Sequence, residues 1–128
     1  MNREVVTSLQ APSAIGPYSQ AVAVTATRTV YLSGQIPLDP QTGQLVDGDV
    51  GRQTTQVMEN LKAVLEAAGL ELKHVVRCTI FLIEMGDFAK VNEVYGTYFP
   101  IAPPARATVA VAALPKGARV EIDAVASA

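Results

Sequence analysis

Two opposite charges lie inside the two most strand-like segments near the C-terminus. Arg106 follows two prolines at the start of an apolar run, and Glu121 stands between Val120 and Ile122. Arginine and glutamate are seldom buried unless they are paired or take part in function. Because a planar guanidinium suits a carboxylate, and a glutamate can orient a water or accept a proton, the two residues predict a site for a small amino or imino acid.

The expected geometry of this site is a hairpin whose loop is formed by residues 114–117. With Ala113 opposite Ala118, the alternation of side chains places four polar residues on one face of the sheet: Arg106, Thr108, Glu121 and Asp123. Arg106 and Glu121 then stand roughly four positions apart, which leaves a gap of small-ligand size. The alternative is a structural ion pair that reaches diagonally or across a subunit boundary, since such networks are common where charges are buried.

Three other segments carry polar groups that could reach a ligand. Tyr18 follows Ile15-Gly16-Pro17 in a loop stiffened by proline, Ser33-Gly34 ends a predicted strand, and Asn92 lies on a predicted helix. Each also has an ordinary structural explanation, as a packed surface tyrosine, a strand terminator and a surface asparagine. These residues do not define a site by themselves.

The single cysteine and the single histidine indicate neither catalysis nor metal binding. Cys78 falls within an apolar strand, and His74 falls at a loop-to-strand junction. A zinc site needs about four clustered ligands, and a catalytic triad needs a nucleophile beside a base. We therefore expect both residues to be structural and expect no metal.

The elements that must position these residues follow the order β, β, β, α, β, α, β, β, as judged from apolar periodicity. The predicted strands cover residues 3–8, 21–25, 29–33, 75–83, 106–112 and 119–126, and the predicted helices begin near Gly51 and Phe88 and end before Gly69 and Pro100. Strands 21–25 and 29–33 are expected to form a hairpin. Because two helices cover only one face of a sheet, and strand 75–83 is apolar on both faces, another copy of the chain should cover the second face.

Composition and charge narrow the class of protein. The 128 residues fit one domain, residues 1–128, and the net charge of −2 with scattered basic residues argues against general nucleic-acid binding. One cysteine excludes an internal disulfide and fits a reducing compartment. The N-terminus lacks the apolar region of a signal peptide, and no apolar run approaches the roughly 20 residues of a membrane helix. We expect a cytoplasmic protein with no membrane partner.

Three motifs taken together resemble the RidA family, also called YjgF/YER/UK and, in an older label, L-PSP endoribonuclease. They are APSAIGPYSQ at 11–20, LSGQIP at 32–37, and PARATV at 104–109 combined with VEI at 120–122. The resemblance runs from about residue 10 to residue 126. It implies a two-layer α+β domain like that of chorismate mutase, with one mixed sheet and two helices on one face. It also implies a homotrimer with clefts between subunits.

The resemblance further implies 2-iminobutanoate/2-iminopropanoate deaminase activity. Such enzymes hydrolyse reactive enamine or imine acids, such as 2-aminoacrylate, to 2-keto acids and ammonia without a cofactor. Arg106 would bind the substrate carboxylate, and Glu121 would position or activate the attacking water. The remaining residues of the cleft would be Tyr18, Ser33, Gly34 through its backbone, Asn92 and Thr108.

Two departures from the family pattern bear on the site. Many relatives carry Ser or Cys where this chain has Ala107 and Thr108, so no thiol is available there and Thr108 supplies only a hydroxyl. The segment 99–104, which would border the cleft, looks short and bears on substrate preference. The alternative functions are a non-catalytic carboxylate-binding or chaperone-like trimer, and an endoribonuclease or translation inhibitor. The lack of a basic surface and of a histidine pair argues against the ribonuclease.

Overall fold

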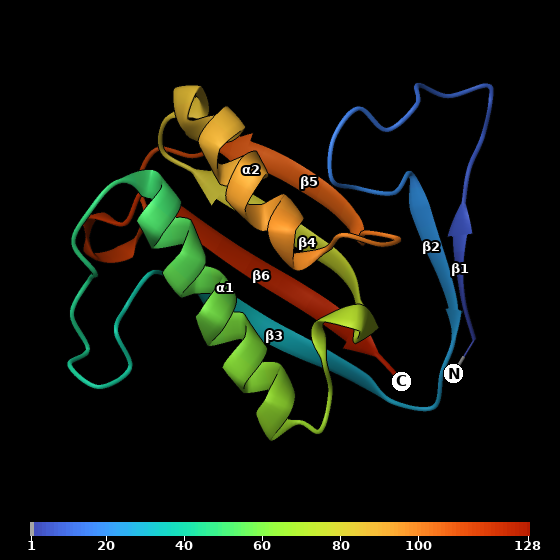
Figure 1. Cartoon of the computed structure of the whole chain (residues 1–128), viewed down its shortest axis with the longest axis horizontal. Coiled ribbons are helices and arrows are strands. Elements are labelled where there is room, and N and C mark those ends of the chain that lie inside the picture. The colour runs from blue at the N-terminus through green and yellow to red at the C-terminus, as the bar shows by residue number, and fades with distance from the viewer. Residues whose placement is uncertain (1) are drawn as a thin grey trace.

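The computed structural model describes residues 2–128 and contains a four-stranded sheet, a separate two-stranded hairpin and two long helices (Figure 1). The strands are β1 (Asn2–Val6), β2 (Ala21–Thr25), β3 (Thr29–Gln35), β4 (Val75–Leu82), β5 (Ala105–Ala110) and β6 (Val120–Ser127), and the α-helices are α1 (Val50–Ala67) and α2 (Phe88–Tyr98). Short 3₁₀ helices occur at η1 (Leu72–His74), η2 (Met85–Asp87) and η3 (Pro115–Gly117). The predicted α+β class and the predicted order of strands and α-helices are confirmed.

The larger sheet has the strand order β3-β6-β4-β5. Strands β4 and β5 are parallel and are joined through α2, whereas β6 runs antiparallel to both β3 and β4. The predicted hairpin between residues 106–112 and 119–126 is therefore wrong, because β4 lies between β5 and β6. A strand, a helix and a strand in succession form a crossover, and a crossover makes the two strands parallel neighbours.

The predicted hairpin of residues 21–25 with residues 29–33 is also wrong. Strand β2 pairs with β1 instead, in an antiparallel register that runs from Asn2–Thr25 to Val6–Ala21. The residues between β2 and β3 do not form a hairpin turn. The backbone of Thr27 and Arg28 hydrogen-bonds instead to Ala128 and so extends the β3–β6 ladder. The β1–β2 hairpin consequently stands apart from the four-stranded sheet (Figure 1).

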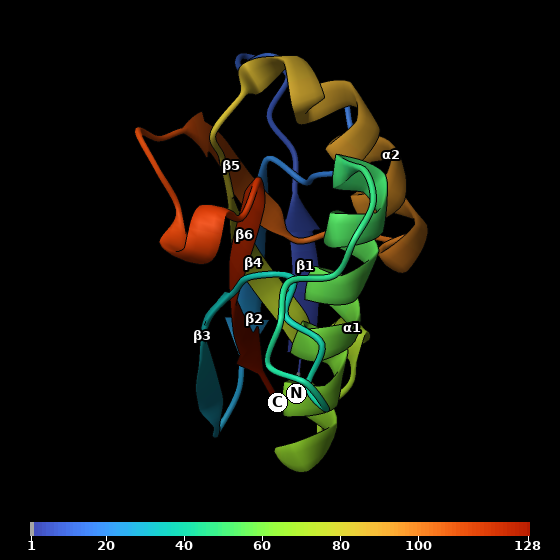
Figure 2. The same ribbon diagram turned by 90° about the vertical axis from the view of Figure 1, so that its left-hand side faces the viewer.

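Both helices pack on the same face of the four-stranded sheet, as expected (Figure 2). The core between the two layers consists largely of aliphatic side chains from α1, β4 and β6, including Val57, Leu61, Leu65, Ile80, Leu82, Val120 and Ile122. Within residues 2–128, neither α-helix has the length and hydropathy needed to cross a membrane.

The end of α1 confirms the predicted stop at Gly69. Gly69 has φ 77°, the left-handed conformation that glycine adopts without strain. The N–H groups of Gly69 and Leu70 donate to the carbonyls of Glu66 and Leu65 at 2.9 and 2.8 Å. These two bonds form a Schellman motif, which satisfies carbonyls that would otherwise lack a donor at the helix end.

Within residues 2–128, no helix covers the second face of the four-stranded sheet (Figure 2). Tyr31 is 79% exposed there and Val109 is 41% exposed, while Phe81 and Val125 are half-buried. An exposed apolar patch of this kind commonly marks a protein–protein contact. Burial of this face by a second copy of the chain stays a prediction.

Candidate active site

Arg106 points from β5 toward α2, on the helix-covered face of the sheet. It stands in register with Cys78 of β4, whose side chain is buried in the core. The guanidinium carbon of Arg106 lies 5.4 Å from the ring centre of Tyr18, 5.6 Å from that of Phe88 and 5.3 Å from that of Tyr95. Three aromatic rings therefore surround this cation, and the negative faces of such rings stabilise positive charge.

Asn92 is the hydrogen-bond partner of Arg106, whose Nη1 donates to Oδ1 of Asn92 at 2.5 Å. Phe88, Asn92 and Tyr95 occupy positions i, i+4 and i+7 of α2 and thus share one side of the helix. A glycine, Gly16, lies close by, since a Cβ there would stand 3.3 Å from Nδ2 of Asn92. Asn92 was predicted from the sequence, whereas Phe88, Tyr95 and Gly16 were not, although helical spacing places both rings on the same side of α2 as Asn92.

Tyr18 reaches the site because its loop is fastened to the segment that precedes Arg106. The backbone N–H of Ser19 donates to the carbonyl of Pro104 at 3.2 Å, and the Ser19 hydroxyl donates to the carbonyl of Pro103 at 2.5 Å. The prolines themselves cannot act as donors, so their carbonyls are the groups available to hold the loop. The first and third motifs of the sequence are thereby joined at one place.

No carboxylate neutralises Arg106 within the described chain. The ion pairs found among residues 2–128 join Lys73 to Glu71, Lys90 to Glu93 and Arg119 to Asp87. Burial lowers the pKa of Arg106, because the charged guanidinium has lost part of its hydration. An arginine nevertheless stays protonated at neutral pH, so the site holds a half-buried cation with unused N–H donors.

Glu121 lies on the opposite face of the same sheet. It stands in register with Phe81 of β4 and directly precedes Ile122, which is buried beneath the helices. Because successive side chains of a strand alternate between faces, Glu121 points away from the helices and Arg106 points toward them. An ion pair between these two residues of one chain is not formed.

Ser33 and Gly34 lie beside Glu121, at an irregularity of β3. The ladder between β3 and β6 shifts register between Leu32 and Gln35, so Ser33 and Gly34 form a β-bulge there. A Cβ on Gly34 would stand 2.9 Å from Cδ of Glu121. Glycine at this position therefore makes room for the carboxylate.

The predicted site residues thus divide into two groups. The group on the helix-covered side contains Arg106, Thr108, Tyr18 and Asn92, and the group on the uncovered side contains Ser33, Gly34 and Glu121. The expectation that Arg106, Thr108, Glu121 and Asp123 share one face is wrong, because β5 and β6 are not neighbours.

Thr108 and Asp123 differ in how their polar atoms are used. The hydroxyl oxygen of Thr108 is buried on the Arg106 side and has no hydrogen-bond partner among residues 2–128. The carboxylate of Asp123 accepts the backbone N–H of Thr79 at 2.9 Å. Asp123 therefore has a structural partner within the sheet, whereas the Thr108 hydroxyl remains available.

Cys78 and His74 both have structural surroundings, as expected. Cys78 is 1% exposed, and burial raises the pKa of its thiol to about 12, so the reactive thiolate is suppressed. Nδ1 of His74 accepts the backbone N–H of Glu71 at 2.9 Å within η1 and its cap. Among residues 2–128, no group of three or more His, Cys, Asp or Glu side chains is placed to hold a metal ion.

The chain is similar to known proteins over nearly its whole length. A family model described as Endoribonuclease L-PSP matches residues 8–128. Protein DfrA of Myxococcus xanthus is 67% identical over 98% of this chain and 96% of its own length. The human 2-iminobutanoate/2-iminopropanoate deaminase is 52% identical over 97% of this chain and 89% of its own length. Among solved structures, YyfB of the conserved Rid protein family from Yersinia pestis is 33% identical, covers 100% of both chains and superposes with a TM-score of 0.90.

Proposed function

The chain belongs to the Endoribonuclease L-PSP family, which includes the Rid proteins, and from this membership we propose that it hydrolyses 2-imino acids to 2-keto acids and ammonia. The substrates that we propose are 2-iminobutanoate and 2-iminopropanoate, the latter together with its enamine tautomer 2-aminoacrylate. Similarity to the human protein, whose name states this activity, supports the substrate class.

The observation that carries the proposal is the unneutralised Arg106. Its guanidinium is half-buried among three aromatic rings and has a neutral side chain, that of Asn92, as its hydrogen-bond partner. A partly desolvated guanidinium binds a carboxylate more strongly than a fully hydrated one. We therefore assign the carboxylate of the substrate to Arg106, with the apolar tail against the rings.

The reaction needs a water and a group that carries protons, and we assign the second role to Glu121. The oxygen of water bonds to C2 of the protonated imine, one water proton passes to the Glu121 carboxylate, and the C=N electron pair moves onto nitrogen. The carboxyl group then returns that proton to nitrogen. The C–N bond breaks with its electron pair on nitrogen, the hydroxyl oxygen forms the keto C=O, and its proton leaves with ammonia as ammonium. Because an imine is already electrophilic, placement of these groups supplies much of the catalysis.

A complete site requires two copies of the chain in this proposal. Arg106 and Glu121 lie on opposite faces of one sheet, and the Glu121 face is uncovered and partly apolar. We propose that a homotrimer brings the partner subunit's Glu121, together with the partner subunit's Ser33 and Gly34, to Arg106. The family resemblance and the open sheet face support this assembly.

The proposal is tested by generating 2-aminoacrylate in place with a dehydratase and following the release of pyruvate. Purified protein should accelerate the release, and Arg106→Ala should abolish most of the acceleration. Arg52→Ala is the matched control, because Arg52 is an exposed arginine of α1 and forms none of the ion pairs among residues 2–128. Its rate should equal that of the wild type.

The outcome that refutes catalysis is an unchanged rate of pyruvate release with folded, oligomeric protein. If pyruvate still binds in that case, and Arg106→Ala removes the binding, the site is a carboxylate receptor without turnover. Glu121→Gln separates the two roles within the enzyme, since it should retain pyruvate binding and lose turnover. Retained turnover in Glu121→Gln would remove the proton-transfer role.

A further inference from the structure

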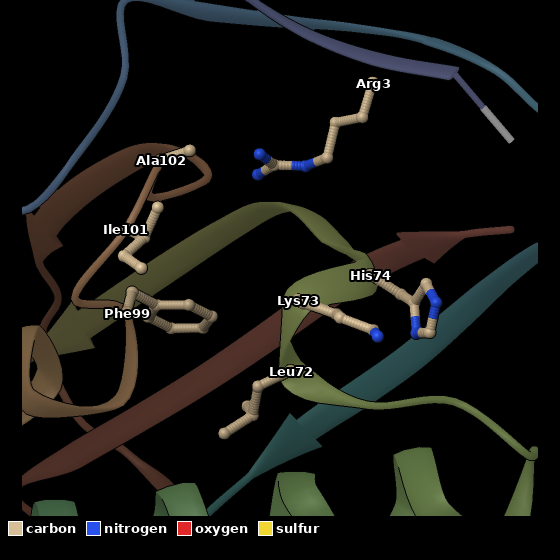
Figure 3. A pocket seen from close by; sticks show the side chains of 7 residues that line it. All are labelled: Arg3, Leu72, Lys73, His74, Phe99, Ile101 and Ala102. Atoms are coloured by element: carbon tan, nitrogen blue, oxygen red, sulfur yellow. The ribbon is translucent and has the colours of Figure 1, made fainter.

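A cavity of about 400 Å³ lies outside the Arg106 site, between β1, η1 and the segment that follows α2 (Figure 3). Its lining combines three basic side chains with four apolar ones: Arg3, Lys73 and His74, and Leu72, Phe99, Ile101 and Ala102. Pockets for small ligands usually have this make-up, an apolar wall with a few polar groups that fix orientation. Its volume also falls in the range of about 300–1,000 Å³ that such pockets occupy.

Arg3 contributes a buried hydrogen-bond donor that lacks an acceptor in the described part of the chain. Figure 3 shows its side chain extending from β1 toward the segment that carries Ile101 and Ala102. Nη2 of Arg3 donates to the carbonyl of Val75 at 3.3 Å, but its Nε is buried and has no partner among residues 2–128. A buried charged donor without an acceptor is destabilising, so this position favours an anionic ligand.

Of the other two basic residues, Lys73 adds positive charge at the cavity and His74 adds a hydrogen-bond donor. Lys73 is 3.3 Å from the Glu71 carboxylate, but both side chains are about 70% exposed, and an exposed ion pair neutralises charge only weakly. Because Nδ1 of His74 accepts the N–H of Glu71, the neutral ring carries its proton on Nε2 and keeps a donor there. Among residues 2–128, no acidic side chain lines the cavity.

The remaining wall is apolar and partly open to water. Ile101 is 84% exposed, although it is a large aliphatic residue, and Phe99 is 7% exposed at the base of the same segment. Ala102 has φ 45°, a left-handed conformation that is unfavourable for residues other than glycine. An exposed isoleucine on a strained turn beside a basic cavity is better explained by a ligand with an apolar portion than by folding alone.

We propose that this cavity is a second binding site, for a monocarboxylate with a branched or aromatic apolar tail. The carboxylate binds the Arg3 guanidinium, with Lys73 at the rim, and the tail packs on Leu72, Phe99 and Ile101. A polyanion such as a nucleotide fits less well, because four of the seven lining residues cannot solvate further charge. The cavity lining shares no residue with the Arg106 site, although Phe99 packs on Tyr95, one of the three rings around Arg106.

The test uses phenylacetate as probe and the full-length Arg106→Ala protein, so that the Arg106 site cannot take up the carboxylate. We expect calorimetry to give a Kd of about 1 mM or tighter, as a small amphipathic ligand in a preformed pocket allows. Phenylacetamide has the same shape without the charge and should bind at least tenfold more weakly. Amide signals of residues 72–74 and 99–102 should shift in NMR spectra during the titration.

Two further substitutions in that background decide the assignment. Arg3→Gln should weaken phenylacetate binding at least tenfold, and Arg52→Ala should leave it unchanged. Because Arg3→Gln could loosen the β1–β2 hairpin, Ile101→Asp provides a second measurement: it changes an exposed residue, cannot disturb the core, and places a repelling carboxylate on the wall. Absence of phenylacetate binding, or equal binding to all of these variants, overturns the proposal. Neither result depends on whether the protein deaminates imino acids.

Discussion

Subunit mixing is the sharpest test of the division between Arg106 and Glu121. In this experiment, the Arg106→Ala and Glu121→Gln proteins are unfolded, mixed in equal amounts and refolded together. Each variant alone should be nearly inactive, since losing a hydrogen bond to a charged group costs about 1.5–3 kcal/mol, or roughly 10- to 150-fold in kcat/KM.

The expected recovery follows from the opposite orientation of the two side chains. If each site takes Arg106 from one subunit and Glu121 from the next, random assembly gives both native residues in about one site of four, because each is present with even odds. The mixture should therefore reach about a quarter of the wild-type rate of pyruvate release. Sites contained within one chain would give no recovery, because every chain lacks one of the two residues.

A matched mixture guards against incomplete exchange of subunits. Wild-type protein refolded with the double variant Arg106→Ala/Glu121→Gln should also give about a quarter of the wild-type rate if sites lie between subunits, but about half if each chain holds its own site. Native mass spectrometry verifies that mixed oligomers have formed. Mixed oligomers that recover no activity in the first experiment and half of it in the second would show that each chain holds its own complete site.

Three further predictions concern single substitutions. Gly34→Ala should lower turnover at least tenfold while the protein stays folded, because the added Cβ would stand 2.9 Å from Cδ of Glu121 and displace the carboxylate; normal turnover in a folded variant would contradict this. Because folding raises the pKa of Cys78 from 9.0 to about 12, the thiol contributes stability below pH 9 that is lost as the pH rises toward 12. The unfolding free energy of Cys78→Ala, measured with urea, should therefore fall less steeply between pH 9 and pH 12 than that of the wild type, and equal slopes would argue against this. Asp87→Ala should cost about 1 kcal/mol of unfolding free energy, since it removes two 2.9 Å hydrogen bonds from Arg119 that join the residue before α2 to the residue before β6. An unchanged urea midpoint would show that the pair contributes nothing.

The elements of the fold were accessible from sequence because they depend on local patterns. Apolar spacing identifies α1 and α2, and the glycine at position 69 marks the end of α1, where it adopts φ 77°. A pattern of this kind reports which side chains are buried, and local turn chemistry reports where an element stops. Neither depends on the identity of the neighbouring strand.

The pairing of the strands could not be predicted from local sequence patterns. Residues 106–112 and 119–126 are adjacent in sequence and read as a hairpin, yet β4, which comes earlier in the chain at Val75–Leu82, lies between them. One available signal was the strand–helix–strand order of β4, α2 and β5, which favours a parallel pair. The β1–β2 pairing had no comparable signal, because the backbone of Thr27 and Arg28, expected to form a turn, hydrogen-bonds instead to Ala128, which is remote in sequence.

The candidate site was predicted in its parts more than in its arrangement. Tyr18, Asn92 and Arg106 do converge, although they come from a loop, a helix and a strand. The convergence depends on two proline carbonyls that hold Ser19, a tertiary contact that leaves no mark on either local sequence. The separation of Glu121 from Arg106 followed from the strand order, so the error in pairing carried over into the site.

The setting of Arg106 has a consequence for the stability of the folded chain. In the ligand-free chain, the Arg106 guanidinium has lost hydration and has no carboxylate partner among residues 2–128, which lowers the stability of the fold until a carboxylate binds. Arg106→Met, which retains the length and apolar stem of the side chain, should therefore raise the melting temperature while it removes carboxylate binding. Substitutions of Arg106 should therefore increase stability and decrease activity, so selection for a more heat-resistant variant would favour loss of the proposed site.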